Sequence, residues 1–417
     1  MKKLEVLFRG WGHDWLLGRL ADNGTQLLFE YSPEALRRGV EFSAMQLPLR
    51  PEAYGGFPGF QSQLPGLLAD ALPDGWGLLL MDKLFLKSGR DPARLSPLDR
   101  LAFIGERAMG ALAFRPADEL PPAEQDLSLL QLATAAQTVV EGEDVAALNA
   151  LVVMGGSPQG ARPKVLVRFD PDTRLVSTRE DVEAQAQAGT PWLIKFPARG
   201  ERPEVCAVEY AYSIAARACG IAMPRTEHFN LGRAMSAFGV ERFDRCGAAA
   251  GAMRVPVHSF AGALHADFRL PSLDYQTVLR ATRFFTRDEV EVSRAFLRCV
   301  FNVVFHNRDD HAKNFALRMN ERLMWQLSPA YDLVFSHGPR GHHQTSVMGE
   351  GLAPGRSHLL ALARAAQVPQ RLALDALARV CAEADRLPQR LDEAGVRRAT
   401  RTTISAAVRD NLRRCAP

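Results

Sequence analysis

The sequence has few of the features that mark secreted or membrane proteins. Its six cysteines include no C-x-x-C pair, and Cys206, Cys219 and Cys299 lie in helix-like apolar runs, so we expect reduced thiols. No apolar run approaches the roughly 20 residues that a membrane-spanning helix needs. The N-terminus is charged and leads into an alternating strand pattern, unlike a signal peptide. The sequence therefore predicts a cytoplasmic protein with no membrane partner.

The sequence also has no large excess of basic over acidic residues. The chain has 51 basic and 47 acidic residues, well mixed, and its net charge of +4 gives no case for a nucleic-acid-binding surface by charge alone. There is no internal repeat and no low-complexity tract. With 417 residues, 47% of them hydrophobic and 24% charged, the sequence predicts an ordinary globular protein of two or three packed units.

Several signatures of hydrolases and metal sites are absent. There is no G-x-S-x-G motif, and no Ser-His-Asp arrangement has supporting context in the sequence. His337, His342 and His343 lie near one another in a Gly/Pro-rich stretch, without the partner spacing of a zinc site. We expect these three histidines in a surface loop.

The most informative stretch is N-R-D-D-H-A-K-N, residues 307–314. Asp309 and Asn314 have the spacing of a protein-kinase catalytic loop, in which the aspartate accepts the proton of the substrate hydroxyl and the asparagine holds magnesium. His311 is expected to support this loop by hydrogen bonding. The pattern D-x-x-x-x-N also recurs by chance, so an ordinary polar loop stays open as the alternative at this point.

The residues that follow strengthen the kinase interpretation. Residues 315–319 and 323–327 predict two strands of a hairpin, followed by S-P-A-Y-D-L. The hairpin would return Asp332 close to Asp309 and Asn314, where it would be a second magnesium ligand. The alternative is a plain hairpin followed by a solvated aspartate.

A glycine-rich segment, G-G-S-P-Q-G-A-R-P-K, occupies residues 155–164 ahead of an apolar strand. Small residues such as Gly160 let backbone amides approach a phosphate, and Lys164 adds positive charge. The segment matches neither G-x-x-x-x-G-K-[ST] nor the usual kinase G-x-G-x-x-G. A phosphate-binding loop and a simple hairpin turn are therefore both open.

One lysine stands in the centre of the next predicted strand, W-L-I-K-F-P. A charged group in an apolar strand is costly to desolvate unless it is paired. In a kinase, this Lys195 would bind the nucleotide phosphates and pair with a glutamate of the following helix, for which Glu209 is the candidate. The alternative is an edge-strand lysine that faces water.

These motifs, in this order, resemble the HipA family of serine/threonine kinase toxins over nearly the whole chain. The segments LADALPDGWG and LAFIGERAMGALAF are similar to the family's N-terminal region. The segments GGSPQGARPKVLV, WLIKFP, EYAYSIAARACGIAMP, VERFDR, NRDDHAKNFALR and LSPAYDL are similar to its kinase core. Two departures are that Gln159 replaces a glycine of the family's loop and that residues 252–270 lack the H-x-E-D-F segment of the best-known members.

The resemblance implies a role for each matching residue. Asp309 would be the catalytic base, Asn314 and Asp332 would hold Mg²⁺, and Lys195 would engage the phosphates of ATP. Two further sets of roles rest on the resemblance alone: Glu241 and Phe243 would form the backbone hinge that contacts adenine, and Ser157 would be the autophosphorylation site. Phosphorylation at that position would add negative charge beside the nucleotide phosphates and so suggests self-inactivation.

The resemblance also implies partners. Known members phosphorylate aminoacyl-tRNA synthetases and are held by a helix-turn-helix antitoxin, so contact with DNA would be indirect. We therefore predict an ATP- and Mg²⁺-dependent serine/threonine protein kinase, the toxin of a toxin-antitoxin pair. The alternatives are a small-molecule kinase on the same scaffold and a non-catalytic kinase-like module that docks an antitoxin.

The predicted fold is α+β and kinase-like, with a β-rich N-terminal lobe and a mostly helical C-terminal lobe. Residues 1–120 are expected to form the N-terminal region. Residues 121–250 would form the kinase N-lobe with the glycine-rich loop and hinge. Residues 251–417 would form the helical C-lobe with the catalytic and magnesium-binding loops.

Overall fold

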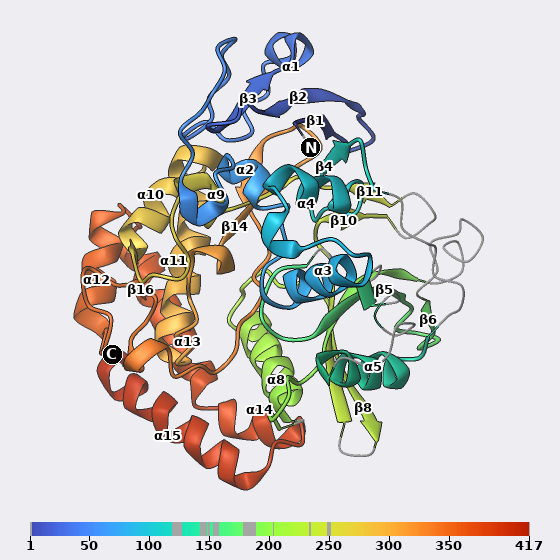
Figure 1. Cartoon of the computed structure of the whole chain (residues 1–417). Helices are drawn as coiled ribbons and strands as arrows, with labels where there is room; N and C mark the ends of the chain where they lie inside the picture. Colours follow the sequence, from blue (N-terminus) through green and yellow to red (C-terminus); the bar gives the residue numbers. More distant parts are fainter. Residues whose placement is uncertain are drawn as a thin grey trace. The chain divides into compact units, whose positions relative to one another are not determined.

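The computed structural model describes residues 2–118, 127–141, 148, 151–152, 158–177, 189–202, 204–232, 235–247 and 252–416. The chain divides into two compact units, one formed by Met1–Pro203 with Phe229–His258 and the other by Glu204–His228 with Ser259–Pro417. The first unit holds the two larger sheets and the second is mostly helical (Figure 1). The predicted α+β class, with a β-rich part and a helical part, is confirmed.

The first sheet of the β-rich unit is built by the N-terminal strands and has the order β3-β2-β1-β4. Its members are β1 (Lys3–Phe8), β2 (Trp15–Asp22), β3 (Leu27–Tyr31) and β4 (Leu112–Arg115), all paired antiparallel. Gly110 has a φ of +73°, outside the strand region, and β4 begins beyond it.

A short helix follows β3 in the chain. It is α1 (Pro33–Arg38), and the Ser32 hydroxyl accepts a capping hydrogen bond from Ala35 N at 3.0 Å. Pro33 stands at its start and Gly39, with a φ of +66°, ends it. These start and stop signals are in the sequence and predict a helix on their own.

The second sheet has the order β6-β5-β7-β9-β8 and carries the predicted nucleotide-binding strands. Its members are β5 (Lys164–Phe169), β6 (Val176–Ser177), β7 (Thr190–Lys195), β8 (Thr226–Gly232) and β9 (Met235–Glu241). The central register pairs Lys164 with Lys195 and Trp192 with Glu241. The phosphate-binding and hinge candidates therefore lie on neighbouring strands of one sheet.

Four α-helices of the described residues complete the β-rich unit. They are α2 (Gly66–Ala69), α3 (Gly75–Lys87), α4 (Pro97–Ile104) and α5 (Leu129–Glu141). Helix α4 begins with a capping box in which the Ser96 hydroxyl and the Asp99 carboxylate each bond the other's backbone N–H. Short elements accompany them, namely η1 (Gly59–Gln61), η2 (Pro92–Arg94) and the ribbon of β10 (Arg245–Cys246) with β11 (Met253–Arg254).

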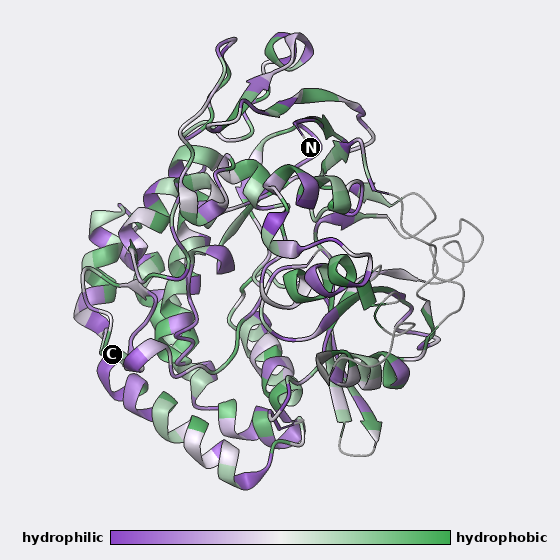
Figure 2. Cartoon of the chain, viewed as in Figure 1, coloured by the Kyte–Doolittle hydropathy of each residue, from purple (hydrophilic) through white to green (hydrophobic). Residues whose placement is uncertain are grey.

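The second unit is built mainly of helices that carry both hydrophobic and hydrophilic residues (Figure 2), and many of their apolar side chains are buried. Its helices are α8 (Glu204–Ala218), α9 (Phe260–Leu264), α10 (Tyr275–Thr286), α11 (Glu289–Val304), α12 (Arg356–Ala365), α13 (Gln370–Ala384), α14 (Leu387–Glu393) and α15 (Arg398–Cys415). Asp288 caps α11, because its side chain accepts a hydrogen bond of 2.8 Å from Val290 N. The apolar residues of α11 recur at helical spacing.

Small strands and turns shape the region around residues 307–346. The predicted hairpin forms as β14 (Ala316–Met319) and β15 (Trp325–Leu327), and β12 (Val257–Ser259) lies on the other side of β14. A short parallel pair joins β13 (Leu273–Asp274) to β16 (Thr345–Ser346). Two 3-10 turns are η3 (Ala312–Asn314) and η4 (Pro339–Gly341).

The N-terminus of α8 is fixed by an ion pair that the sequence did not predict. The carboxylate of Glu204 accepts hydrogen bonds from Arg397 Nε at 2.7 Å and Nη2 at 2.9 Å. A hydrogen bond from the Thr400 hydroxyl adds to this pair. The bonds from Arg397 are the main reason why the pKa of Glu204 falls to about 2. They connect the first turn of α8 to the first turn of α15.

All six cysteines are free thiols, as predicted. None of the helices within the described ranges is long and apolar enough to cross a membrane.

Candidate functional site

The predicted catalytic loop leaves the end of α11 and is held in place by its arginine. Arg308 is buried, and its guanidinium donates to the backbone carbonyls of Gly341 and, at 3.0 Å, Leu352. Hydrogen bonds between a charged donor and buried carbonyls are stronger than neutral ones. The arginine of the N-R-D motif therefore ties the start of the loop to the segment around residues 341–352.

Asp310 is completely buried and accepts hydrogen bonds from several elements. The Tyr275 hydroxyl donates to its Oδ2 at 2.9 Å, and His343 Nδ1 donates to the same oxygen at 2.9 Å. The backbone N–H groups of Gln344, at 2.8 Å, and Thr345, at 3.3 Å, bond Oδ1. A buried carboxylate is tolerated when its oxygens are satisfied in this way. Asp310 is thus the structural centre of the loop.

Asp309, the neighbouring residue, has the opposite environment. Its side chain is 48% exposed, so it can approach a molecule in solution. Gln344 Nε2 donates to its Oδ1 at 3.0 Å, and His311 Nε2 lies 3.9 Å from the same oxygen. Of two consecutive aspartates, only Asp309 combines a fixed orientation with access to a substrate. This contrast supports the assignment of the base to Asp309.

The predicted magnesium ligands lie on two segments that contact each other. Asn314 Nδ2 donates to the backbone carbonyl of Asp309 at 2.6 Å, which leaves the amide oxygen of Asn314 as the atom available to a cation. The Tyr331 hydroxyl donates to Lys313 O at 2.6 Å, so the residue before Asp332 contacts the residue before Asn314. Asp332 itself has a φ of +53°.

The donor types at this position suit magnesium. An amide oxygen and one carboxylate are hard oxygen ligands, and Mg²⁺ usually completes its shell with water and substrate phosphates. Among the residues that the structure describes, no group of three or more His, Cys, Asp or Glu side chains could hold a metal ion.

His343 lies in a different environment from the one that we predicted. We expected His337, His342 and His343 in a surface loop, and the first two are exposed. His343 is buried, because its Nδ1 bonds the carboxylate of Asp310. That expectation was therefore wrong for His343, and the loop composition gave no sign of the buried partner.

An aromatic contact supports the other side of the catalytic loop. Lys313 Nζ lies 4.1 Å from the centroid of the Phe268 ring, which is within the range of a cation–π interaction. The same ring lies 5.7 Å from the imidazole of His311. The Nε2 of His311 is too far from Asp309 for a hydrogen bond of normal length. The contact with Phe268 thus packs His311 against the loop, and its expected hydrogen-bonding role stays a prediction.

The glycine-rich loop is described from Pro158 onward, and Ser157 lies outside the described residues. Gly160 has a φ of +103°, a backbone conformation that favours glycine. The ammonium of Lys164 donates to the backbone carbonyl of Gln159, across the turn. These contacts give residues 159–164 a compact, defined conformation.

Lys195 is buried at the end of β7 and is the cross-strand partner of Lys164, which is buried too. Its ammonium lies 5.8 Å from the ring centroid of Phe238. Cross-strand partners place their side chains on the same face of the sheet. The predicted alternative of a water-facing edge lysine is wrong, because β7 is an inner strand. Glu209 is buried in α8, which belongs to the other unit, so its pairing with Lys195 stays a prediction.

The predicted hinge follows directly from β9. Glu241 is the last residue of that strand, and Phe243 lies in the turn after it, both partly exposed. The next residue, Asp244, is buried between Arg242 and Arg245, with an oxygen–nitrogen distance of 2.8 Å to each. Burial opposes ionisation of this carboxyl, but the two guanidinium groups outweigh it and hold the pKa of Asp244 below its ordinary value.

A Ser-His-Asp arrangement that the sequence did not indicate is present in the β-rich unit. His258 Nδ1 lies 2.7 Å from Asp70 Oδ2, and its Nε2 lies 3.0 Å from the Ser43 hydroxyl. Ser43 and His258 are both buried, with exposed fractions of 1% and 0%. A nucleophile must reach its substrate, so these residues do not form a hydrolytic site. They connect three distant segments of the unit.

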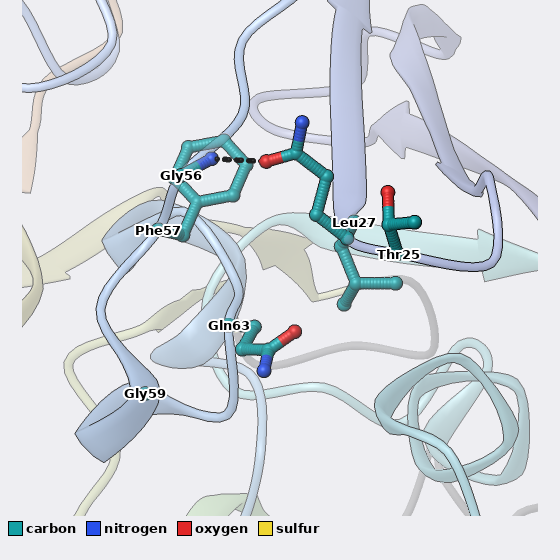
Figure 3. Close-up of a pocket in the computed structure, with 7 residues that line it drawn as sticks. Thr25, Leu27, Gly56, Phe57, Gly59 and Gln63 are labelled. Carbon is teal, nitrogen blue, oxygen red and sulfur yellow. Dashed lines mark hydrogen bonds between the residues drawn. The ribbon is translucent and has the colours of Figure 1, made fainter.

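A shallow pocket of about 250 Å³ lies elsewhere in the β-rich unit (Figure 3). Gln26 and Gly56 line it, and Gly56 N donates to Gln26 Oε1 at 3.0 Å. The complete lining is Thr25, Gln26, Leu27, Gly56, Phe57, Gly59 and Gln63. None of the predicted catalytic or nucleotide-binding residues takes part in it.

His306, just before the catalytic loop, predicts a pH dependence of stability. Its Nδ1 lies 3.1 Å from Asn411 Nδ2, which can only donate, so the buried ring is neutral. Burial, followed by repulsion from Arg308 and His343, lowers the pKa of His306 from 6.5 to about 3. The unfolded chain binds a proton near pH 6.5 and the folded chain does not, so stability falls as the pH drops from 6.5 toward 3.

Urea unfolding of wild type and His306→Gln at about pH 7.5 and about pH 5 measures this effect. Between the two pH values, the free energy of unfolding of the wild type should fall by about 1 to 2 kcal/mol more than that of the variant. The control is His13→Gln, which changes an exposed histidine and should lose as much as wild type. Equal losses in wild type and His306→Gln would contradict the assignment.

Comparisons with known proteins agree with this geometry. The HipA-like C-terminal domain matches residues 156–387, and the HipA N-terminal domain matches residues 9–115. The chain matches no curated protein sequence.

Among solved structures, HipA of a Shewanella oneidensis MR-1 toxin-antitoxin system, solved with HipB and operator DNA, aligns over 99% of this chain and 96% of its own. The TM-score is 0.69 at 18% sequence identity, which shows a shared fold. The proinflammatory kinase CtkA of Helicobacter pylori matches with a TM-score of 0.40 and 13% identity, over 54% of this chain and 87% of its own. Because the C-terminal domain match spans more than half of the sequence and the N-terminal match precedes it, the chain belongs to the HipA family.

Proposed function

We propose that the chain is an ATP- and Mg²⁺-dependent serine/threonine protein kinase. The observation that carries the proposal is the contrast between Asp309 and Asp310. Asp310 is buried and fully engaged in holding the loop, whereas Asp309 is half exposed and oriented by Gln344. A general base needs both a fixed position and access to the substrate hydroxyl.

The nucleotide-binding part of the proposal rests on the second sheet. Lys164 and Lys195 are buried cross-strand partners, so their side chains lie on the same face of the sheet. Their ammonium groups would engage the phosphates of ATP from that face, and Gly160 would allow close approach of the loop backbone. Glu241 and Phe243 would contact adenine through their backbone groups.

In the proposed mechanism, the Asp309 carboxylate accepts the proton of a serine or threonine hydroxyl while that oxygen attacks the γ-phosphorus of ATP. The bond between the γ-phosphorus and the β–γ bridging oxygen breaks, and ADP leaves. Asn314 and Asp332 would hold Mg²⁺, which neutralises charge on the phosphates when bound. Lys195 would orient the phosphates, and Glu209 would fix the lysine. Positioning and charge stabilisation would supply most of the rate enhancement.

The biological role is proposed from the family. The chain would be a cytoplasmic toxin held by a helix-turn-helix antitoxin, as the Shewanella oneidensis HipA is found with HipB and operator DNA. It would contact DNA only through that antitoxin. Its substrate would be a translation component such as an aminoacyl-tRNA synthetase, and Ser157 would be its autophosphorylation site.

The nucleotide-binding role of Lys195 gives one prediction. Lys195→Met should raise the KM for ATP at least tenfold, because a charge-assisted contact to phosphate is lost. The measurement is the initial rate of ADP release at increasing ATP concentration. Lys3→Met, at an exposed lysine of β1, is the matched control and should leave the KM unchanged. An unchanged KM in Lys195→Met would contradict the role.

A test of acceptors separates the proposed function from its two alternatives. The protein is incubated with labelled ATP, Mg²⁺ and either purified aminoacyl-tRNA synthetases or a set of hydroxyl-bearing metabolites. We expect label on serine or threonine of a protein. Label on a metabolite alone would indicate a small-molecule kinase. Nucleotide binding without any transfer would indicate a non-catalytic module that docks an antitoxin.

A further inference from the structure

The glycine-rich loop is bonded to a segment of the N-terminal region more than 80 residues earlier in the chain. The side-chain amide of Gln159 donates to two backbone carbonyls of this segment, Asp70 O at 3.0 Å and Leu72 O at 3.1 Å. Gly160 N donates to the carboxylate of Asp74. Gln159 thus bonds the backbone of residues 70 and 72, and Gly160 bonds the side chain of Asp74.

The two segments also touch through their backbones. Trp76 N donates to Gly160 O at 3.1 Å, and the indole Nε1 of Trp76 donates to Lys164 O at 3.1 Å. Gly75 has a φ of +43°, and a Cβ there would lie 2.8 Å from both Ala161 Cα and Gly160 O. No side chain fits between the segments, so residues 70–76 form a close support for residues 159–164.

The predicted hinge has a similar support from the same N-terminal region. Asp244 Oδ2 accepts a hydrogen bond from Gly110 N at 2.8 Å, and Arg245 Nη1 donates to Gly110 O at 3.1 Å. Arg254 donates to four backbone carbonyls of this region, those of Glu106, Ala108, Gly110 and Leu112. Segment 106–112 therefore encloses the charged groups that follow the hinge.

We infer that the HipA N-terminal domain, residues 9–115, positions the glycine-rich loop and the hinge of its unit, and that Gln159 is a positioning residue for ATP. The inference rests on the proposed function, since the loop and the hinge are nucleotide-binding elements by that proposal. Gln159 acts through the loop in two ways. Its amide anchors the loop to residues 70–72, and its carbonyl holds the ammonium of Lys164. A loop held in its binding conformation loses less entropy when a ligand arrives.

The test is steady-state kinetics of Gln159→Ala and Gln159→Glu with ATP as the varied substrate. Each variant removes the two side-chain hydrogen bonds, and the second keeps the size of the side chain. We expect the KM for ATP to rise about tenfold, the effect of two ordinary hydrogen bonds, while kcat stays within about twofold. A purely structural role would lower the melting temperature and leave the KM of the folded enzyme unchanged.

The matched control is Gln26→Ala. It removes a hydrogen bond between a glutamine side chain and the backbone of the N-terminal region, in which Gln26 Oε1 accepts from Gly56 N, far from the loop in sequence. It should leave the KM for ATP unchanged. A KM within about twofold of wild type, or below it, for both Gln159 variants would overturn the inference. The proposed function fails separately, when the wild type itself neither binds nor consumes ATP.

Discussion

Asp309→Asn should lower kcat for phosphoryl transfer by about 10²- to 10⁴-fold, the usual contribution of a general base. The asparagine keeps an oxygen that can accept the hydrogen bond from Gln344 Nε2, so the loop should keep its conformation. What is lost is the carboxylate that takes the proton from the hydroxyl. Transfer of labelled phosphate from ATP to a protein acceptor measures the effect.

The fold should hardly respond to this change. Asp309 is half exposed, and substitutions at such positions usually alter the free energy of unfolding by no more than about 0.5 kcal/mol. Asp410→Asn, at an exposed residue of α15, is the control and should keep full activity. A rate for Asp309→Asn within about tenfold of wild type would show that this carboxylate is not the base.

Asp310→Ala should have the opposite effect and lower the free energy of unfolding by about 3 to 5 kcal/mol. It leaves four donors without their acceptor, two from the side chains of Tyr275 and His343 and two from the backbone, and three of the four bonds are buried. Burial and the Asp310 charge raise the pKa of Tyr275 well above its ordinary value, so the phenol stays a donor. Urea unfolding at neutral pH measures the loss.

A second variant keeps this prediction testable when Asp310→Ala does not fold. Asp310→Asn retains one acceptor oxygen and should lose less stability, about 1 to 3 kcal/mol. Asp309→Asn, one residue away, is the matched control for both. A stability of Asp310→Ala within about 1 kcal/mol of wild type would contradict the central role of this carboxylate.

The sequence predicted the features that depend on local pattern. The hairpin of β14 and β15 and the strand of Lys195 both follow from apolar alternation and turn residues. The spacing of Asp309 and Asn314 predicted a catalytic loop because the chemistry needs both within one short segment, and that role stays a prediction.

The partners of the loop could not be predicted, because they come from distant parts of the chain. Asp310 bonds Tyr275, 35 residues earlier, and His343, 33 residues later, and no local pattern links these positions. The Gly/Pro-rich surroundings of His343 are typical of a surface loop. In the folded chain His343 is buried and bonds the carboxylate of Asp310, a contact between distant segments that the local sequence does not show.

Asp74 shows the same division between local and long-range information. It stands at the N-cap position of α3, a position that aspartate favours. Its carboxylate makes no capping hydrogen bond to that helix and instead accepts one from Gly160 N, 86 residues later. Local pattern thus located the helix start, while the contact to the glycine-rich loop required the folded chain.

The central claim is phosphoryl transfer to a protein hydroxyl that depends on Asp309. The most direct measurement is mass spectrometry of wild type and Asp309→Asn after incubation with ATP and Mg²⁺, alone and with a purified aminoacyl-tRNA synthetase. We predict phosphate on Ser157 or on the synthetase with wild type, and none on either with the variant. The claim is contradicted if wild type leaves both proteins unmodified, or if the variant transfers as much phosphate as wild type.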